Sequence, residues 1–189
     1  MLKYFKWHIL FQRPRVFKYK LLSNNKRVSG RPICNQPALL IGKGEIRFGN
    51  NVHLGYYPSP FFYNGYIHLE SRSEESVISI GNNTYINNNF FAVSDKQGIY
   101  IGNDVFIGVN CEIIDSDFHS VSPDKRSGGE SVSKKVVIGN NVFLGNNVKI
   151  AKGVVLGDNV VVANGSVVGS SFDSNVIIGG VPAKIIGTV

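Results

Sequence analysis

Aliphatic residues recur at every sixth position in the second half of the chain, and a glycine or an alanine follows each of them. The unbroken run comprises Ile138-Gly139, Leu144-Gly145, Ile150-Ala151, Leu156-Gly157 and Val162-Ala163. A period of six differs from the 3.6-residue period of an amphipathic helix and from the two-residue period of a strand. It predicts a coil with short flat sides and sharp corners, whose inward aliphatic side chains stack on those of the neighbouring coils.

Pieces of the same pattern occur in the first half of the chain. They are Phe48-Gly49, Leu54-Gly55, Ile80-Gly81, Ile101-Gly102 and Ile107-Gly108. Asparagine often follows the glycine, and both residue types accept the positive φ that tight corners need. Stacked coils satisfy their backbone hydrogen bonds by pairing with the coils above and below. We therefore expect an all-β fold.

Two segments interrupt the repeats. Residues 115–135 are polar and rich in turn-forming residues. A regular solenoid tolerates an insertion at a corner without loss of its core, and such loops tend to carry function. An aromatic segment at residues 56–63 breaks the early repeats. Its rings could stack on sugar faces, cover the open end of the coils or form a subunit contact, and the sequence leaves these alternatives open.

The end of the chain adds a second motif, which reads Ile178-Gly179-Gly180-Val181-Pro182-Ala183-Lys184-Ile185-Ile186-Gly187. With the repeats, it resembles the hexapeptide-repeat acyltransferases, in particular bacterial sugar and polysaccharide O-acetyltransferases, over residues 40–189. The resemblance implies a left-handed parallel β-helix with an N-terminal capping segment and an inserted active-site loop. We expect a basic, aromatic cap at residues 1–40 and a β-helix acyltransferase domain at residues 41–189.

The resemblance implies transfer of an acetyl group from acetyl-CoA to a hydroxyl of a sugar, in a precursor of a surface polysaccharide or lipopolysaccharide. Two alternatives stay open: an antibiotic O-acetyltransferase, which shares the closing motif, and a β-helix scaffold without catalysis. A zinc enzyme of this architecture needs three histidine ligands near one site. The body offers only His53, His68 and His119, without the spacing of such enzymes, so we expect no metal.

His119, in the loop, is the expected catalytic base. Acetyl transfer to a hydroxyl needs a group with a pKa near neutrality, and histidine meets this need. Sugar O-acetyltransferases of the family carry their catalytic histidine in this loop. A carboxylate that fixes the histidine tautomer could be Glu130, which matches the family by position, or Asp117 or Asp115. The resemblance assigns the oxyanion of the tetrahedral intermediate to the backbone N–H of Asn146.

The resemblance also assigns binding residues for the donor and the acceptor. Coenzyme A in this family lies along the later coils, between the subunits of a homotrimer. Gly145 and Ala163 match the small residues there, and Lys184 matches the basic residue near the nucleotide phosphates. Asn87 and Asp95 match the contacts to the acceptor hydroxyl groups, so the expected partner is a glycan or another small acceptor.

Positive charge is concentrated at the start of the chain. Nine of the 20 lysines and arginines lie in residues 1–31, which contain no acid, whereas the remainder has 11 bases and 13 acids. Six aromatic residues accompany the nine bases. We favour a cap on the first coil over contact with an anionic membrane surface, and no recognition motif supports nucleic-acid binding.

The rest of the composition adds little to the expected fold and function. No apolar stretch is long enough to span a membrane, and Lys3 and Lys6 interrupt the apolar start that a signal peptide would need. We expect a cytoplasmic protein, peripheral at the inner face of the membrane if the basic tail binds lipid. Two cysteines form no disulfide framework, and Cys111 occupies an inward position of the repeat.

Overall fold

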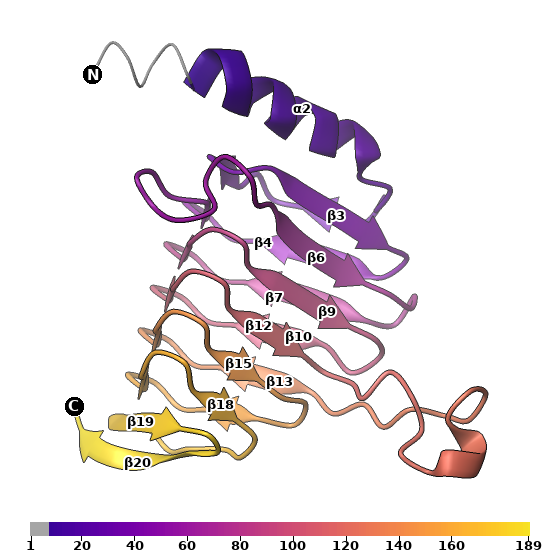
Figure 1. The fold of residues 1–189 in the computed structure, drawn as a ribbon, viewed down its shortest axis with the longest axis vertical. Helices are drawn as coiled ribbons and strands as arrows, with labels where there is room; N and C mark the ends of the chain where they lie inside the picture. The colour runs from indigo at the N-terminus through magenta and orange to yellow at the C-terminus, as the bar shows by residue number, and fades with distance from the viewer. Residues whose placement is uncertain (1–7) are drawn as a thin grey trace.

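The computed structural model describes residues 8–189 and contains three β-sheets that form the sides of a prism (Figure 1). The chain passes through sheets A, B and C in turn and then continues into the next coil. Neighbouring strands in each sheet run parallel, except that β20 turns back antiparallel to β19 at the C-terminal end. This arrangement is the stacked coil that the six-residue period predicts.

The strands are short because each side of the prism is short. Sheet A contains β1 (Val28–Ser29), β4 (Glu45–Phe48), β7 (Val77–Ile80), β10 (Ile99–Ile101), β13 (Val136–Ile138) and β16 (Val155–Leu156). Sheet B contains β2 (Ile33–Cys34), β5 (His53–Leu54), β8 (Tyr85–Ile86), β11 (Phe106–Ile107), β14 (Phe143–Leu144), β17 (Val161–Val162), β19 (Val176–Gly180) and β20 (Ala183–Thr188). Sheet C contains β3 (Ala38–Gly42), β6 (Ile67–Ser71), β9 (Phe91–Ser94), β12 (Glu112–Ile114), β15 (Lys149–Ile150) and β18 (Val167–Val168).

The aliphatic position of each hexapeptide points into the prism. Successive coils place these side chains in direct register, and the column in sheet B consists of Leu54, Ile86, Ile107, Leu144 and Val162. All five are buried and belong to one continuous hydrophobic core. The inward orientation predicted from the repeat is confirmed. Cys111 is also buried in this core, as its repeat position predicts.

Asparagine side chains form ladders along the corners of the prism. The Nδ2 group of Asn141 donates to Asn159 Oδ1 at 2.9 Å, and Asn159 donates in the same way to Asn175 at 2.7 Å. All three residues have positive φ, which confirms the conformation expected at the corners. The ladders explain why asparagine is preferred there over glycine, because each amide binds the equivalent amide of the next coil.

A helical segment covers the N-terminal end of the coils and comprises η1 (His8–Gln12) and α2 (Arg13–Leu22) (Figure 1). Strands β1 and β2 follow it and pair with β4 and β5, so the first coil starts inside the segment expected as a cap. The structure moves the start of the β-helix from residue 41 to residue 28. The repeat is too irregular there to be recognised in the sequence. Within the described residues, no helix has the length and apolar character needed to cross a membrane.

Candidate active site

The loop between β12 and β13 spans residues 115–135 and projects from the corner between sheets C and A (Figure 1). It contains one short helical turn, η2 (Pro123–Lys125). The two ends of the loop are tied together, because the backbone N–H of Asp117 donates to Val132 O at 3.2 Å and that of Lys134 donates to Asp115 O at 2.8 Å. The two ends of the loop are therefore held in place, although its tip is exposed.

Asp115 anchors the ends of the loop from the interior of the protein. Its buried carboxylate accepts hydrogen bonds from Ser94 Oγ at 2.8 Å and from the backbone N–H groups of Asp95, Gln97 and Gly98 at 2.6, 3.0 and 2.8 Å. These four bonds fix the turn that follows β9. They occupy the carboxylate of Asp115, whereas Nδ1 of His119 lies beside the Arg126 carbonyl.

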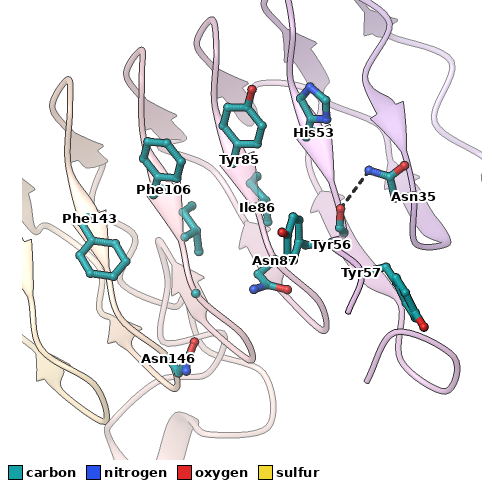
Figure 2. A pocket seen from close by; sticks show the side chains of 13 residues that line it. Asn35, His53, Tyr56, Tyr57, Tyr85, Ile86, Asn87, Phe106, Phe143 and Asn146 are labelled. Carbon is teal, nitrogen blue, oxygen red and sulfur yellow. Dashed lines mark hydrogen bonds between the residues drawn. The ribbon is translucent and has the colours of Figure 1, made fainter. Parts of the chain in front are cut away.

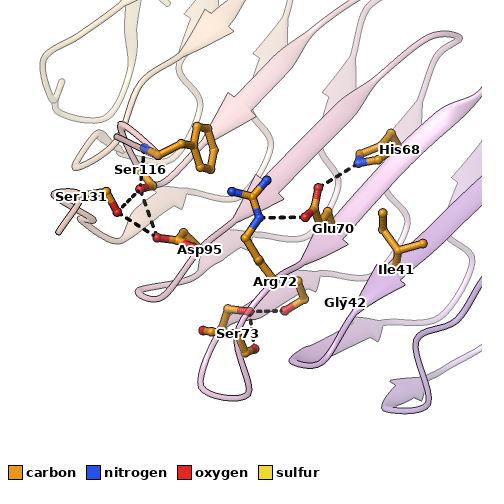
Figure 3. Close-up of polar contacts among 12 residues, drawn as sticks. Ile41, Gly42, His68, Glu70, Arg72, Ser73, Asp95, Ser116 and Ser131 are labelled. Atoms are coloured by element: carbon orange, nitrogen blue, oxygen red, sulfur yellow. Dashed lines mark hydrogen bonds and ion pairs between the residues drawn. The ribbon is translucent and has the colours of Figure 1, made fainter. Parts of the chain in front are cut away.

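Asp95 lies next to this turn and faces the loop (Figure 3). One of its carboxylate oxygens, Oδ2, accepts hydrogen bonds from the hydroxyl groups of Ser116, Ser131 and Ser133 at 3.3, 3.1 and 3.4 Å. The residue expected to contact the acceptor therefore also holds both ends of the loop. The sequence did not indicate this role, since the serines are separated from Asp95 by more than 20 positions.

An ion pair between Glu70, on β6, and Arg72, just after this strand, supports the same loop. The guanidinium group of Arg72 lies 4.7 Å from the centre of the Phe118 ring, and its Nε donates to Glu70 at 2.8 Å (Figure 3). Burial opposes ionisation of Glu70, but hydrogen bonds from Arg72 and His68 outweigh it and lower the pKa of this carboxyl. Arg72 thus stays fixed by a carboxylate on one side while its other face covers the residue before His119.

His119 itself is exposed, and its Nδ1 lies 3.3 Å from the backbone carbonyl of Arg126. When Nδ1 carries the proton, it donates to that carbonyl and leaves the Nε2 lone pair free to accept a proton. The partner of Nδ1 in the structure is thus a backbone carbonyl, at a place where we expected a carboxylate. Asp117 instead forms an ion pair with Lys152 at 2.5 Å, and Glu130 is exposed.

A second group of expected residues lies at another corner, between sheets B and C. Asn87, Gly108, Gly145 and Ala163 occupy equivalent positions in four successive coils. Each donates its backbone N–H to the residue immediately before the next member of the column. The residues expected to contact the acceptor and the donor are thus aligned along one edge of the prism. Gly108 and Gly145 are buried because the next coil packs closely against them, whereas Asn87 and Ala163 are half-buried.

A cavity of about 720 Å³ borders this corner on the side of sheet B. Four rings from successive coils, those of His53, Tyr85, Phe106 and Phe143, form a row along it (Figure 2). The ring of Tyr85 stacks on that of His53 with centroids 4.6 Å apart and on that of Phe106 at 5.3 Å. We did not predict this row, although an aromatic ring stands one residue before the aliphatic position in each of these four coils.

Asn146 lines the cavity together with Asn87, but its backbone N–H is already engaged. That group donates to Asn164 Oδ1 at 2.8 Å, while the side-chain oxygen of Asn146 accepts from the N–H of Val109 at 2.8 Å. The N–H expected to bind the oxyanion is therefore occupied by Asn164 in this conformation. The sequence did not indicate this contact, because Asn164 lies 18 positions further along the chain.

The residues expected near coenzyme A have different surroundings. Gly145 is buried, and a Cβ atom added there would lie 2.3 Å from Asn164 Oδ1, so the glycine is needed for coil stacking as well. Ala163 is half-buried, and Lys184 is exposed on β20. Two further lysines of the later coils form ion pairs, Lys149 with Glu112 at 3.0 Å and Lys152 with Asp117.

The expected site residues therefore form two groups within one chain. His119, Asp117, Glu130 and Asp95 belong to the loop corner between sheets C and A, whereas Asn87, Asn146, Gly145 and Ala163 belong to the corner between sheets B and C. The width of sheet C separates the two groups, as the strand β9 between Asn87 and Asp95 illustrates. Among residues 8–189, no cluster of three or more histidine, cysteine or acidic side chains is arranged to hold a metal ion.

Two family models match the repeats. The model described as bacterial transferase hexapeptide (six repeats) matches residues 135–170, and the hexapeptide repeat of succinyl-transferase matches residues 98–120. Together they cover the coils on either side of the loop. The match supports the assignment of these coils as hexapeptide repeats.

Two curated relatives carry names of acetyltransferases. The galactoside O-acetyltransferase of Lactococcus lactis is 39% identical over 108 residues, which cover 57% of this chain and 51% of that protein. The putative lipopolysaccharide biosynthesis O-acetyl transferase WbbJ of Escherichia coli is 34% identical over 145 residues, which cover 77% of this chain and 61% of that protein. The chain thus spans between half and two thirds of the length of these relatives.

A solved structure of a galactoside acetyltransferase in complex with coenzyme A is similar to this chain, with a TM-score of 0.58 and 31% sequence identity. The similarity covers 75% of this chain and 64% of that one. These structural relatives have the left-handed parallel β-helix, so the fold expected from the resemblance is confirmed.

Proposed function

We propose that this chain, which belongs to the hexapeptide-repeat family of acyltransferases, transfers an acetyl group from acetyl-CoA to a hydroxyl group of a sugar. The observation that carries the proposal is the corner column Asn87-Gly108-Gly145-Ala163, of which Asn87 and Gly108 line an aromatic cavity. Its similarity to a galactoside acetyltransferase that binds coenzyme A supports the assignment of the donor. The match to a protein named for lipopolysaccharide biosynthesis supports a surface polysaccharide or lipopolysaccharide precursor as the acceptor.

The donor would lie along this column. Gly145 and Ala163 allow a narrow chain such as pantetheine to approach the backbone, and the exposed Lys184 at the end of the coils can pair with phosphate groups. Lys149 and Lys152 are weaker candidates because Glu112 and Asp117 already neutralise them. The reaction joins two bound substrates directly and requires no metal ion.

His119 is the proposed base. Its Nε2 accepts the proton of the acceptor hydroxyl as the oxygen forms a bond to the thioester carbonyl carbon. The imidazolium that results is stabilised at Nδ1 by the Arg126 carbonyl, and Glu130 on the same loop supplies further negative charge. When the tetrahedral intermediate collapses, the carbon–sulfur bond breaks and His119 returns its proton to the departing thiolate.

Asn146 can serve the oxyanion only after a local change. Its backbone N–H points to Asn164 Oδ1, so the amide of Asn164 must turn away before the N–H can bind the oxyanion. The proposed acceptor contacts, Asn87 and Asp95, lie at the two corners that the acceptor must bridge. Asp95 also keeps the loop in position through Ser116 and Ser131.

The proposed enzyme is a homotrimer in which each site forms between two copies. Within one chain, the base on the loop and the cavity occupy different corners, so the loop of one copy must meet the cavity of the next. The exposed rings of Phe106 and Phe143 along the cavity support such an interface, because large exposed apolar patches mark contact surfaces. Since acetyl-CoA is a cytoplasmic metabolite, we place the reaction in the cytoplasm.

The test is the release of free thiol from acetyl-CoA in the presence of a panel of sugars, nucleotide sugars and antibiotics. We expect turnover with a sugar acceptor, and we expect His119→Ala to lower kcat by about 10²- to 10⁴-fold, as for other general bases. Lys125→Ala is the matched control, because Lys125 is an exposed residue of the same loop.

Each other outcome contradicts a separate part of the proposal. Turnover with antibiotics alone would show that the acceptor is an antibiotic and not a sugar. Full activity of the His119→Ala variant would show that this residue is not the catalytic base. If the protein neither releases thiol from acetyl-CoA nor binds acetyl-CoA in calorimetry, it is a scaffold without catalysis.

A further inference from the structure

The inner side of the N-terminal helical segment is attached to the coils by polar contacts. Gln12, which is buried, donates to the carbonyls of Asn35 and Phe62 at 3.0 and 2.8 Å. Arg15 donates to Gly65 O at 2.7 Å. None of the α2 residues is fully buried, so the helix contributes almost no apolar side chain to the core. These contacts hold α2 in place without using its apolar residues.

The outer side of the same segment exposes large apolar side chains to solvent. Leu10, Phe17, Leu21 and Leu22 are between 55% and 70% exposed. Phe17 and Leu21 are one helical turn apart, and Leu10 lies two turns before Phe17, so the three residues share a face. A folded protein seldom leaves several large apolar side chains of one short helix in water, and such a group marks a surface that another body covers.

Positive charge accompanies this face. Arg13, Lys18 and Lys20 belong to α2 and are exposed. The first acidic residue of the whole chain is Glu45, so no carboxylate in the preceding sequence neutralises these groups. Apart from residues 1–31, the chain carries a slight excess of acids. The charge is therefore a property of this end of the molecule.

The position of α2 leaves this face accessible to a flat surface. The helix lies across the N-terminal end of the coil stack, while the 115–135 loop and the β19–β20 hairpin lie further along the stack (Figure 1). A plane can contact α2 without touching either of these elements. Any rotational symmetry axis parallel to the stack would place α2 of every copy on the same side.

We propose that α2 docks the protein on an anionic lipid bilayer, with the helix lying in the plane of the interface. A lipid surface takes up both kinds of side chain at once. Leucine and phenylalanine enter the boundary of the acyl chains, and the long lysine side chains extend to the negatively charged headgroups. A protein partner would need a groove that is both apolar and acidic. This inference does not depend on the acetyl transfer proposed above.

The experiment is co-sedimentation of the full chain with vesicles of phosphatidylcholine alone and of phosphatidylcholine mixed with phosphatidylglycerol. We expect binding to the anionic vesicles that weakens as salt is raised, because screening reduces the attraction between lysines and headgroups. Phe17→Ser/Leu21→Ser and Lys18→Glu/Lys20→Glu should each lower the vesicle-bound fraction at least about tenfold.

Matched controls lie away from α2. Val181 and Ile186, on the C-terminal hairpin, are 71% and 63% exposed, so Val181→Ser/Ile186→Ser removes similar apolar surface. Lys96→Glu reverses a charge at an exposed position of the body. Both controls should keep wild-type binding. Since no α2 residue is fully buried, the variants should also keep the wild-type melting temperature, which shows that they are folded.

Two results would overturn the proposal. One is the absence of wild-type binding to anionic vesicles, and the other is equal binding by the wild type and the α2 variants. If the wild type does not bind and the Phe17→Ser/Leu21→Ser variant changes its oligomeric state, this face is a contact between copies of the chain.

Discussion

At the scale of single residues, the carboxylate of Asp115 links the interior to the loop. It closes the turn after β9 with four hydrogen bonds, and its own backbone carbonyl accepts from Lys134 at the other end of the loop. Asp95, held in that turn, then binds three serine hydroxyls of the loop. The orientation of His119 therefore depends on two carboxylates that do not touch it.

Replacing Asp115 with asparagine should destabilise the protein by about 2 kcal/mol, because an amide NH₂ group would face backbone N–H donors that now bind a carboxylate. The measurement is urea unfolding monitored by circular dichroism. Asp173→Asn changes an exposed acid and should stay within about 0.5 kcal/mol of the wild type. Equal stability of the two variants would show that the Asp115 network contributes nothing.

A second prediction at this scale concerns Cys111 and the pH dependence of stability. Burial raises the pKa of its thiol to about 11, from 9.0 in an exposed cysteine. The unfolded chain therefore loses this proton first, so the contribution to stability is intact below pH 9 and falls as the pH rises from 9 to 11. In a Cys34→Ser variant at about pH 8, a thiol reagent should label Cys111 only after unfolding. Rapid labelling of the native protein would contradict its burial.

At the scale of elements, the corners of the coils carry as much information as the flat sides. Asn141 adopts φ 54° and donates to Asn159, so this one position combines a left-handed conformation with a side-chain bond between coils. The two contributions can be separated by substitution. Glycine keeps the conformation and loses the bond, whereas alanine loses both.

We expect Asn141→Ala to lower stability by about 1–2 kcal/mol more than Asn141→Gly does, since alanine adds the strain of a left-handed backbone. The measurement is the urea midpoint of the two variants and the wild type. Equal midpoints for alanine and glycine would show that the corner relaxes to another conformation. A glycine variant as stable as the wild type would show that the asparagine ladder is energetically neutral.

The same scale explains which features the sequence could predict. The β-helix and the limits of the loop follow from a strict local period, because each coil repeats the same contacts. The first coil and α2 could not be predicted from the sequence. The only glycine of residues 28–40, Gly30, follows a serine and so does not show the aliphatic–glycine pair of the repeat. The polar contacts of Gln12 and Arg15 hold α2 in place.

Features that depend on contacts between residues far apart in the sequence could not be predicted either. The engagement of Asn146 by Asn164, and of Asp117 by Lys152, joins residues 18 and 35 positions apart. The role of the Arg126 carbonyl beside His119 depends on the backbone path of the loop, which side-chain identity does not reveal.

At the scale of the whole molecule, three regions of the stack have separate proposed functions. The lipid-facing helix proposed above lies at the N-terminal end, the aromatic cavity lies on sheet B, and the loop projects from the far side of sheet C. A single copy keeps the base and the cavity apart. The central claim is therefore that one copy supplies His119 to the cavity of its neighbour.

Mixing of inactive variants tests this claim most directly. One chain carries His119→Ala, and the other carries Asn87→Ala/Phe106→Ala in the cavity, so each homotrimer should be inactive. In randomly mixed trimers, about a quarter of the junctions join an intact loop to an intact cavity. We predict that co-expression restores about a quarter of the wild-type rate of thiol release from acetyl-CoA. A mixed trimer that stays as inactive as its parents would contradict a site shared between copies.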